Sequence, residues 1–301
     1  MLSICIPVFN VDVRPLVQQL NEQIAHADAT FQLIVIDDAS RPEIKKVNQT
    51  LASICTYVEL PENIGRSAIR NRFLEYATQD FLLFLDCDAA IISADFLKNY
   101  VEYLRKANPK VVLGASVYQD EEPDKLHRLR WYYSVHRESK TLEQRLKNPD
   151  LGFKTNNFVI EKKLFASIRF DERLKNYGHE DTLFGFHLKE RKIKIHHIDN
   201  PVLNKILDSN QRFLEKTEEG IRSLVTILQF EIPTTEFTKQ VRLLSFYRKM
   251  KQNFLLRIFF LATLPFKQFI KGLLQNGNTN LRLFDLYKLM VLHKVLKQTK
   301  S

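Results

Sequence analysis

The chain has 301 residues, of which 45% are hydrophobic and 27% are charged, with only 8 glycines and 10 prolines. This composition excludes collagen-like, low-complexity and wholly disordered proteins, and the length suffices for one large domain with an appendage or for two small domains. Cys5, Cys55 and Cys87 form neither a CxxC motif nor a Cys/His cluster with zinc-ligand spacing. The sequence therefore predicts reduced cysteines in an intracellular protein.

The net charge of +10 is unevenly distributed along the chain. Residues 238–301 contain 13 lysines and arginines and one acidic residue, Asp285, whereas residues 1–237 contain 32 basic and 34 acidic side chains. A near-neutral body is thus followed by a strongly basic tail. Regions that differ so much in charge are expected to meet different partners.

Neither end of the chain predicts a membrane-spanning segment. The first residues, MLSICIP, have no basic segment, long apolar stretch or small-residue cleavage site, so we expect no signal peptide. The longest strongly apolar stretch, Phe254 to Phe266, contains Arg257 and falls short of the roughly 20 residues that a spanning helix needs.

The first 120 residues alternate between predicted strands and predicted helices. Continuous apolar runs predict strands over Leu2–Val8, Phe31–Ile36, Ile54–Leu60, Phe81–Leu85 and Val111–Val117. Apolar residues at helical spacing predict helices that begin at Pro15, at Asn63 and after a cap at Ser93, and a weaker helix over Pro42–Ala52. This alternation is typical of an α/β fold with a mainly parallel sheet covered on both faces.

The pattern changes after residue 120. Residues Glu121–Pro149 show no clean periodicity, Glu180–Lys192 is a predicted helix, and Ile193–Ile198 is expected to return to the sheet. From about Asn210 to the end the pattern is helical. We expect one domain over residues 1–210, in two halves that meet near residue 120, and a helical region over residues 211–301.

Polar motifs follow four of the predicted strands. Ligands of an open parallel sheet bind beyond the carboxyl ends of its strands, so these motifs are candidates for a site. No GxGxxG follows the first strand and no GxxxxGK[ST] occurs in the sequence, which argues against a dinucleotide oxidoreductase and a P-loop NTPase. The four motifs are Pro7-Val8-Phe9-Asn10, Asp37-Asp38-Ala39-Ser40, the segment from Pro61 to Arg66, and Asp86-Cys87-Asp88.

Each motif has both a ligand-binding and a purely structural interpretation. Asp86 and Asp88 offer hard oxygen ligands that suit Mg²⁺ or Mn²⁺ bridging a diphosphate, or they simply end a strand and bond a turn. Asp37 and Asp38 offer acceptors for a base or a ribose, or they form an Asx turn. Arg66 stands with Arg70 at the start of a helix that either faces an anion or is a capped surface helix.

Taken together with Gly178-His179-Glu180-Asp181, these motifs resemble the family 2 glycosyltransferases of the GT-A fold, in the family's order and rough spacing over residues 3–190. The resemblance implies a GT-A-like, Rossmann-type sheet over residues 1–210, with a nucleotide-sugar half at 1–120 and an acceptor half at 121–210. It also implies a nucleoside-diphosphate sugar donor, a UDP-sugar being favoured, a divalent Mn²⁺ or Mg²⁺ ion, and inversion at the anomeric carbon.

The resemblance carries roles over to individual residues. Asp86 and Asp88 resemble the pair that positions the ribose and the metal diphosphate. The residues similar to those around the nucleotide and donor are Pro7, Phe9, Asn10, Asp37, Asp38, Asn63, Arg66 and Asp86.

The acceptor side and the general base come from later motifs. Glu180 and Asp181 match the acidic pair that supplies the base, with Asp181 preferred, since inverting transfer needs a group that takes the acceptor hydroxyl proton; alternatively both are acids at a helix N-terminus. The loop residues Lys154, Thr155, Asn156 and Asn157 resemble those that line the donor sugar and acceptor. Trp131 and His179 are further acceptor-side candidates, although a packing role is the commoner use of both residue types.

One position departs from the family pattern. Many relatives place a metal-binding histidine after the base-bearing helix, where this chain has Asn204. An amide oxygen is a weaker ligand than imidazole for a transition metal, so the departure puts the metal requirement in question. His196 or His197 are candidate substitutes, with strand-end histidines as the alternative.

The tail combines phenylalanine and leucine with interleaved lysine and arginine over Tyr247–Leu274 and Leu281–Leu296. Basic amphipathic helices of this kind lie on anionic membrane surfaces, so residues 238–301 predict peripheral attachment to the inner face of the cytoplasmic membrane. The alternative is a helical subdomain that packs on the body. No nucleic-acid-binding motif accompanies the charge, so we expect no nucleic acid partner.

The sequence thus predicts a hexosyl- or N-acetylhexosaminyl-transferase that acts on a glycan or lipid-linked glycan in the synthesis of lipopolysaccharide, capsule or exopolysaccharide. Two alternatives stay open: a metal-dependent sugar nucleotidyltransferase, and a non-catalytic membrane adaptor that binds nucleotide sugars. The first would bring a glycine-rich, basic loop after its first strand, where this chain has Val8-Phe9-Asn10-Val11-Asp12.

Overall fold

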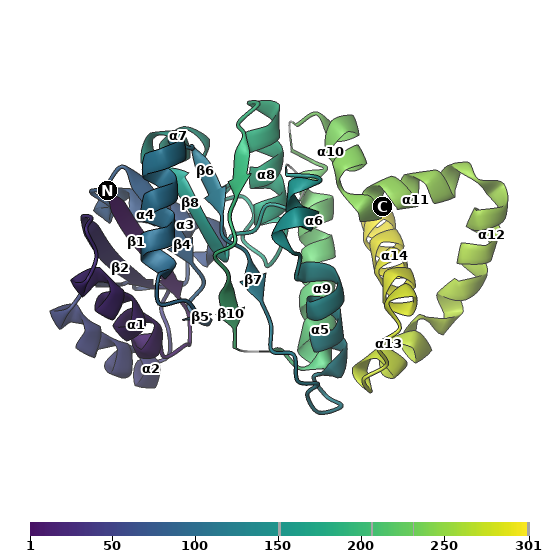
Figure 1. Cartoon of the computed structure of the whole chain (residues 1–301). Coiled ribbons are helices and arrows are strands. Elements are labelled where there is room, and N and C mark those ends of the chain that lie inside the picture. The colour runs from purple at the N-terminus through teal and green to yellow at the C-terminus, as the bar shows by residue number, and fades with distance from the viewer. Residues whose placement is uncertain (150–151, 206, 231, 300–301) are drawn as a thin grey trace. The chain divides into compact units, whose positions relative to one another are not determined.

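The computed structural model describes residues 1–149, 152–205, 207–230 and 232–299. The chain forms two compact units (Figure 1). The sheet unit comprises residues 1–119, 139–175 and 180–206, and the helical unit comprises residues 120–138, 176–179 and 207–301. A single boundary at residue 210 does not capture the two internal segments that belong to the helical unit.

The sheet unit is built on a seven-stranded mixed sheet with the order β3-β2-β1-β4-β8-β6-β9. Strands β3, β2, β1 and β4 are parallel, β8 is antiparallel to both of its neighbours, and β9 runs parallel to β6. The bounds are β1 Leu2–Val8, β2 Phe31–Asp37, β3 Thr56–Glu59, β4 Phe81–Leu85, β6 Val111–Leu113, β8 Asn157–Glu161 and β9 Ile195–His197. The prediction of a mainly parallel sheet is confirmed for the first four strands, and Ile195–His197 returns to the sheet as expected.

A second, three-stranded sheet has the order β5-β10-β7, with bounds Ala89–Ile91, Val202–Asn204 and Ser116–Val117. The single strand predicted over Val111–Val117 is therefore wrong, because the segment divides between the two sheets. Ala115 between them has a positive φ of 77°. Gly114 has no room for a side chain, since a Cβ there would lie 2.1 Å from the Tyr100 hydroxyl.

Helices cover both faces of the large sheet because its strands are apolar on both sides. On one face, alternate β1 residues such as Ile4 and Ile6 pack with residues of α1 and α4, and on the other face Cys5 packs with residues of α3, α7 and α8. The helices of this unit are α1 Arg14–Ala25, α2 Pro42–Asn48, the 3₁₀ turn Gln49–Ser53, α3 Gly65–Tyr76, α4 Phe96–Ala107, α6 Leu142–Leu146, α7 Lys162–Ile168 and α8 Glu180–Glu190. The predicted cap at Ser93 is wrong, since α4 begins after Asp95.

The helical unit confirms the prediction of helices after residue 210. Its long helices α9 and α14 pack together, with the Phe213 and Phe284 rings 5.1 Å apart, and Glu218 of α9 accepts from Lys271 at 2.9 Å and from the Tyr287 hydroxyl. The bounds are α5 Arg128–Tyr133, a π-helical turn Ser134–Glu138, α9 Asn210–Ile227, α10 Thr234–Gln240, α11 Arg242–Gln252, α12 Phe254–Thr263, a 3₁₀ turn Leu264–Phe266, α13 Lys267–Gln275 and α14 Leu281–Gln298.

Within the described residues no single helix has the length and apolar composition to cross a bilayer. Among the described residues, one pair of helices has the required length and apolar composition when its two members are taken together. The pair is Arg242–Gln252 and Phe254–Gln275, and it is bent by 111° at the junction.

Candidate functional site

The predicted site residues of the sheet unit gather where β1, β2 and β4 end. Asp37 is the last residue of β2, Asp86 directly follows β4, and Asn10 lies in the loop after β1. The carboxyl ends of these parallel strands share one edge of the sheet, as strands β2, β1 and β4 are neighbours. This is the edge at which open α/β sheets bind their ligands.

Short hydrogen bonds join the loops after β1 and β2. Asn10 has a positive φ of 58°, its N–H donates to the Ser40 hydroxyl at 2.8 Å, and its side-chain oxygen accepts from the Arg41 N–H at 2.9 Å. Asp37 is fully buried and accepts from the Ser40 N–H at 2.6 Å. Both side chains therefore shape the loops of the site, and Phe9 beside them is half-exposed.

Asp38 holds the start of α3. Its two carboxylate oxygens accept from the N–H groups of Ile64 at 2.8 Å and Gly65 at 3.2 Å, and the Asn63 amide donates to its carbonyl oxygen at 3.2 Å. Burial raises the pKa of Asp38, and the two backbone donors oppose that rise. Gly65 has a φ of 84°, which a side chain rarely adopts, so a glycine suits this turn.

Arg70 is the centre of the charged groups. It is 2% exposed, and its guanidinium donates to Asp86 Oδ1 at 2.9 Å and to the Arg66 carbonyl at 3.0 Å. Arg66 in turn donates to the buried carboxylate of Glu180 at 2.7 Å. The start of α3, the end of β4 and the start of α8 are thereby connected through ion pairs.

The surroundings of Arg70 lower the pKa of its guanidinium. Burial lowers this pKa most and the Arg66 charge lowers it further, whereas the carboxylates of Asp86, Glu180 and Asp181 raise it. The Nε atom of Arg70 is buried and has no hydrogen-bond partner among the described residues. The hydrogen bonds of this cation go to Asp86 and to the Arg66 carbonyl, and Arg66 in turn contacts Glu180.

Asp181 lies one residue after Glu180 in the first turn of α8. Lys154 lies 3.4 Å from its Oδ2 atom, and its Oδ1 atom accepts from the Thr182 N–H at 2.6 Å. The carbonyl of Asn156, in the same loop as Lys154, accepts from the Asp86 N–H at 3.2 Å. The loop before β8 thus contacts both the residue at the end of β4 and the acid at the start of α8.

Asn157 does not offer its side chain to a ligand. It is buried, its Oδ1 atom accepts from the Tyr100 hydroxyl at 2.6 Å, and its Nδ2 atom donates to the carbonyls of Ala115 and Asn200 at 2.8 Å. Sequence reasoning assigned Asn157 to the acceptor side with its loop neighbours. The structure instead uses this amide to join β8 to the segments that lead into β7 and β10, and Thr155 in the loop before β8 is also buried.

Asp88 stands next to Asn204 through the second sheet. Asn204 in β10 pairs with Ala89 in β5, and the Lys205 N–H donates to the Asp88 carbonyl at 3.5 Å. Burial and the two adjacent carboxylates raise the pKa of the Cys87 thiol to about 12, which opposes a thiolate ligand. The side chains with oxygen donors within two residues of the backbone contact between Lys205 and Asp88 are those of Asp86, Asp88 and Asn204.

These donors fit a hard divalent cation that keeps part of its shell for other ligands. Mg²⁺ in particular is commonly held by one or two carboxylates together with substrate phosphates. No cluster of three or more His, Cys, Asp or Glu side chains able to hold a metal occurs in the part of the chain that the structure describes. Two carboxylates and one amide therefore suit a metal that arrives with a diphosphate better than a resident one.

His196 and His197 do not replace Asn204. The Nδ1 atom of His196 bonds the Tyr103 hydroxyl at 2.9 Å, and that of His197 bonds Arg145 at 3.2 Å. Both rings are thus used to hold β9 in the fold.

Trp131 and His179 belong to the helical unit. Trp131 lies in α5 with its ring centroid 6.4 Å from that of Tyr132, and His179 has a positive φ of 67°. Their acceptor-side roles stay predictions.

Arg70 is predicted from the sequence, together with Arg66, to face an anion or to be solvated, and the structure buries it against Asp86 instead. Arg70 lies four residues after Arg66 and hence on the same side of α3. Its burial was the part that the sequence did not predict, since an arginine on a helix is usually solvated.

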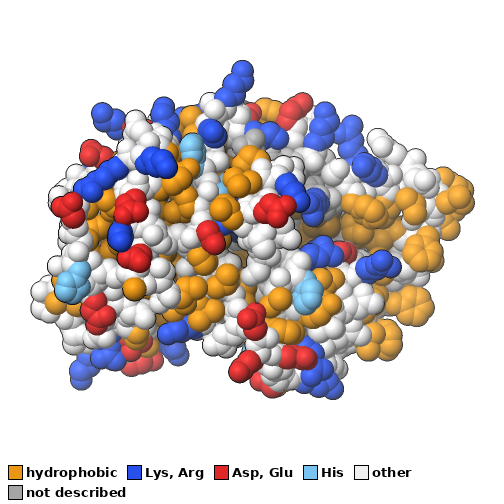
Figure 2. All heavy atoms as spheres, viewed as in Figure 1, with side chains coloured by type: hydrophobic (Ala, Val, Ile, Leu, Met, Phe, Trp, Pro, Cys, Tyr) orange, Lys and Arg blue, Asp and Glu red, His pale blue; other side chains and the backbone are white. Residues whose placement is uncertain are grey.

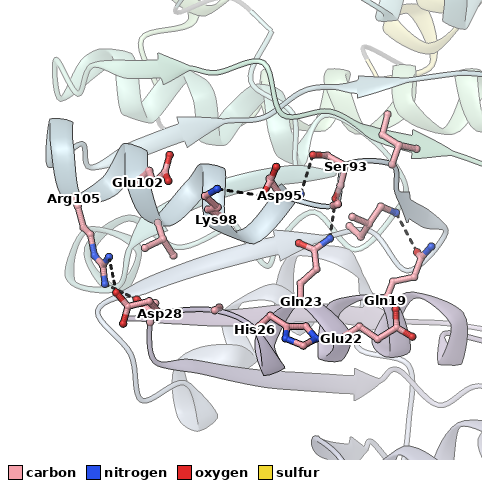
Figure 3. Close-up of a pocket in the computed structure, with 16 residues that line it drawn as sticks. Gln19, Glu22, Gln23, His26, Asp28, Ser93, Asp95, Lys98, Glu102 and Arg105 are labelled. Carbon is pink, nitrogen blue, oxygen red and sulfur yellow. Dashed lines mark hydrogen bonds and ion pairs between the residues drawn. The ribbon is translucent and has the colours of Figure 1, made fainter.

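A separate groove of about 970 Å³ lies between α1 and α4 of the sheet unit (Figure 3). No predicted site residue lines it. Gln23 bonds Ser93 and Leu97 across it, Gln19 bonds the Ile91 N–H, and Arg105 bonds Asp28. The polar groups of this groove serve the packing of the two helices.

Comparisons with known proteins identify the family of this chain. The profile of the family described as glycosyl transferase family 2 matches residues 3–168, which is more than half of the chain. An uncharacterized glycosyltransferase of Haemophilus influenzae is 25% identical over 187 residues, covering 61% of this chain and 70% of that protein.

Solved structures share the fold at low sequence identity. Residues 1–349 of S. aureus TarS superpose with a TM-score of 0.52 at 18% identity, covering 99% of this chain and 91% of that one. The mannosyltransferase PcManGT of Pyrobaculum calidifontis, in complex with GDP-Man and Mn²⁺, gives a TM-score of 0.58 at 14% identity, covering 99% and 86%. The chain has the GT-A fold, and it is a member of glycosyl transferase family 2.

Proposed function

We propose that this family 2 glycosyltransferase moves a hexosyl or N-acetylhexosaminyl unit from a nucleoside-diphosphate sugar to an acceptor hydroxyl, with inversion at the anomeric carbon. The observation that carries the proposal is the pair of contacts made by α3: Arg70 donates to Asp86 at the end of β4, and Arg66 donates to Glu180, the residue before Asp181, at the start of α8. A UDP-sugar is the favoured donor. Structures of TarS with UDP-GlcNAc and of PcManGT with GDP-Man support a nucleotide-sugar donor in proteins of this fold.

Asp181 is the proposed general base. Its carboxylate takes the proton of the acceptor hydroxyl as that oxygen forms a bond to the anomeric carbon, while the bond from this carbon to the diphosphate oxygen breaks on the opposite face. Lys154 lies 3.4 Å from the Asp181 Oδ2 atom, so this carboxylate has a cation beside it. Arg66 and Arg70 add positive charge near the end of β4, where the departing diphosphate is expected to gather negative charge.

Asp86 and Asp88 would hold a divalent Mn²⁺ or Mg²⁺ ion, with Asn204 beside them. Such an ion, when bound, neutralises negative charge on the diphosphate. Structures that contain Mn²⁺, such as PcManGT and the glucosyl-3-phosphoglycerate synthase of Mycobacterium tuberculosis, support metal use in related folds.

The proposed acceptor is a glycan or a lipid-linked glycan of the cell surface, as in lipopolysaccharide, capsule or exopolysaccharide synthesis. Peripheral attachment to the inner face of the cytoplasmic membrane through residues 238–301 accompanies this role. The basic character of these residues supports it, because an anionic membrane surface attracts lysine and arginine. Membership of family 2 favours glycosyl transfer over the nucleotidyltransferase alternative.

The test is turnover of nucleotide sugars by the full chain and by Asp181→Asn. We expect Asp181→Asn to lower kcat by about 100-fold or more, because a base contributes that much, and to leave donor binding nearly unchanged. Asp171→Asn is the matched control, since Asp171 pairs with Arg173 and takes no part in the proposed chemistry. The anomeric configuration of the product, read by ¹H NMR, should be opposite to that of the donor.

An unchanged rate in Asp181→Asn would favour the non-catalytic adaptor or another base. A product with retained configuration would overturn the inverting mechanism.

A further inference from the structure

The structure separates the basic tail into covered and uncovered helices. In α14 the apolar residues are buried, among them Phe284, Tyr287 and Leu292. In α12 they are exposed: Leu255 is 75% exposed, Phe254 73% and Phe259 69%. Two helices of similar sequence therefore differ in their exposure. The apolar side chains of α14 are mostly packed inside the protein, whereas those of α12 are mostly exposed.

The most exposed apolar side chains of α12 lie on one side of the helix. Phe254, Leu255, Ile258 and Phe259 follow the spacing i, i+1, i+4 and i+5, which places them on a common face. Phe260 on another side is buried, with its ring centroid 5.5 Å from that of His293 in α14. The helix is thus held to its unit by one side and presents the other to the surroundings.

Exposed apolar residues also occur in α11, in the 3₁₀ turn Leu264–Phe266 and in α13. We call these residues and those of α12 together the apolar ridge, and Figure 2 shows the hydrophobic side chains that gather over α12. It comprises the exposed residues Phe246, Phe254, Leu255, Leu256, Ile258, Phe259, Leu261, Phe266 and Phe269. So many large apolar side chains on one surface mark an interaction site rather than ordinary surface.

The segment that carries the apolar ridge holds charges of one sign, although one of them, Lys271, pairs with Glu218 of α9 at 2.9 Å. No acidic residue occurs in the sequence between Glu236 and Asp285, whereas the segment around α12 contains seven basic ones. These are Arg242, Arg248, Lys249, Lys251, Arg257, Lys267 and Lys271. Basic side chains around an apolar face complement a lipid surface with anionic headgroups.

The same charge disfavours a second copy of this chain as the partner. Two apolar ridges packed together would bring their basic residues near each other without an intervening acid, and like charges at an interface are costly. The helix α12 is too short to cross the hydrocarbon core of a bilayer. Ten residues of α-helix extend about 15 Å, about half of the hydrocarbon thickness of a bilayer.

We propose that α12 lies in the plane of an anionic membrane with the apolar ridge against the acyl chains, and that α14 makes no lipid contact. This inference deepens the membrane attachment in the proposed function and rests on it, but it is independent of the catalytic chemistry. Arg257 lies beside the apolar residues of α12, where its long side chain reaches the headgroups.

The test is flotation of the full-length protein with phosphatidylcholine vesicles that contain or lack phosphatidylglycerol. We expect wild type to float with the anionic vesicles and the double variant Leu255→Glu/Phe259→Glu to lose more than about tenfold in partitioning, because two apolar side chains are replaced by charges. The matched control is Leu126→Glu/Leu146→Glu, which makes the same change in net charge at two exposed leucines outside the apolar ridge.

Retained flotation of the Leu255→Glu/Phe259→Glu variant would overturn the proposal. So would equal losses in this variant and in the control, since the effect would then come from net charge alone. A change from dimer to monomer in the variant, with vesicle binding unchanged, would identify a second copy as the partner. Thermal stabilisation of each variant by nucleotide sugar is measured in parallel, so that a failure of donor binding is distinguished from a failure of lipid binding.

Discussion

At the scale of single residues, Arg70 connects the parts of the candidate site. Its guanidinium is buried against Asp86, and the Arg66 carbonyl takes a second hydrogen bond from it. Replacing Arg70 with an apolar residue leaves the Asp86 carboxylate without its cation. The loss of one partner of a buried ion pair destabilises a protein strongly, because the remaining charge is no longer compensated.

We therefore predict that Arg70→Met lowers the free energy of unfolding by roughly 2 kcal/mol or more, a value reduced from that of a fully buried pair because Asp86 is partly exposed. Urea denaturation measures this change. Arg72→Met, at an exposed arginine of the same helix that pairs with Glu75, should change it by less than about 0.5 kcal/mol. Equal effects of the two substitutions would contradict the central role of Arg70.

Asn204 is the residue at which this chain departs from its relatives. Its pairing with Ala89 places it one residue from Asp88 along the opposite strand. We predict that Asn204→His tightens Mn²⁺ binding in the presence of a nucleoside diphosphate by about tenfold, or roughly 1.4 kcal/mol, because imidazole is a better ligand than an amide for this ion. Titration calorimetry checks it, and an unchanged affinity would place this side chain away from the metal.

At the scale of elements, the start of α3 depends on Asp38. The carboxylate accepts two backbone N–H groups that the helix itself leaves without partners. The acid thereby fixes the helix that carries Arg66 and Arg70.

We predict that Asp38→Ala destabilises the protein by about 2 kcal/mol, since it removes a cap and leaves partly buried donors unpaired. Asp95→Ala is the matched control, because Asp95 precedes α4 but its side chain makes no capping hydrogen bond. The two values come from urea denaturation. If Asp95→Ala costs as much as Asp38→Ala, the capping interpretation is wrong.

The elements also show what the sequence could and could not predict. Strands β1, β2 and β4 are long apolar runs, so their bounds were predicted nearly to the residue. Strands β5, β7 and β10 have three residues or fewer, too short for any periodicity to appear. Strand β8 and helix α7 were missed because Asn157 begins the strand and a polar loop precedes it.

The sequence predicts that the polar motifs share one edge of the sheet, whereas it does not predict the order of all the strands. Short polar motifs after strands identify an edge of the sheet whatever the order of the strands. Asn157 was assigned to the ligand because its sequence neighbours resemble a ligand-binding loop, and only its burial and three hydrogen bonds assign it to the fold. Tertiary contacts of this kind leave no local pattern in the sequence.

At the scale of the whole molecule, composition divides the chain into a near-neutral part and a basic part, and the compact units follow a similar division. The exposed apolar side chains of α12 lie in the basic part of the chain, so this part offers both apolar surface and positive charge. Association with an anionic surface should therefore have an electrostatic component that salt weakens and an apolar component that remains.

We predict that raising NaCl from about 0.1 M to about 1 M, which shortens the Debye length from about 10 Å to about 3 Å, lowers binding of the wild-type chain to anionic vesicles by about tenfold or more. Co-sedimentation at each salt concentration measures it. Binding that does not respond to salt would mean that the basic residues of the tail take no part in attachment.

The measurement that bears most directly on the function is thermal unfolding of the full chain with UDP-, GDP-, TDP- and CMP-sugars, with and without Mn²⁺. We predict that one of these donors raises the Tm of the wild type in a metal-dependent manner, and that Asp88→Ala loses the metal-dependent part of the rise. Unfolding temperatures that no nucleotide sugar changes, or that change equally in the wild type and in Asp88→Ala, would contradict donor binding at the ends of β1, β2 and β4.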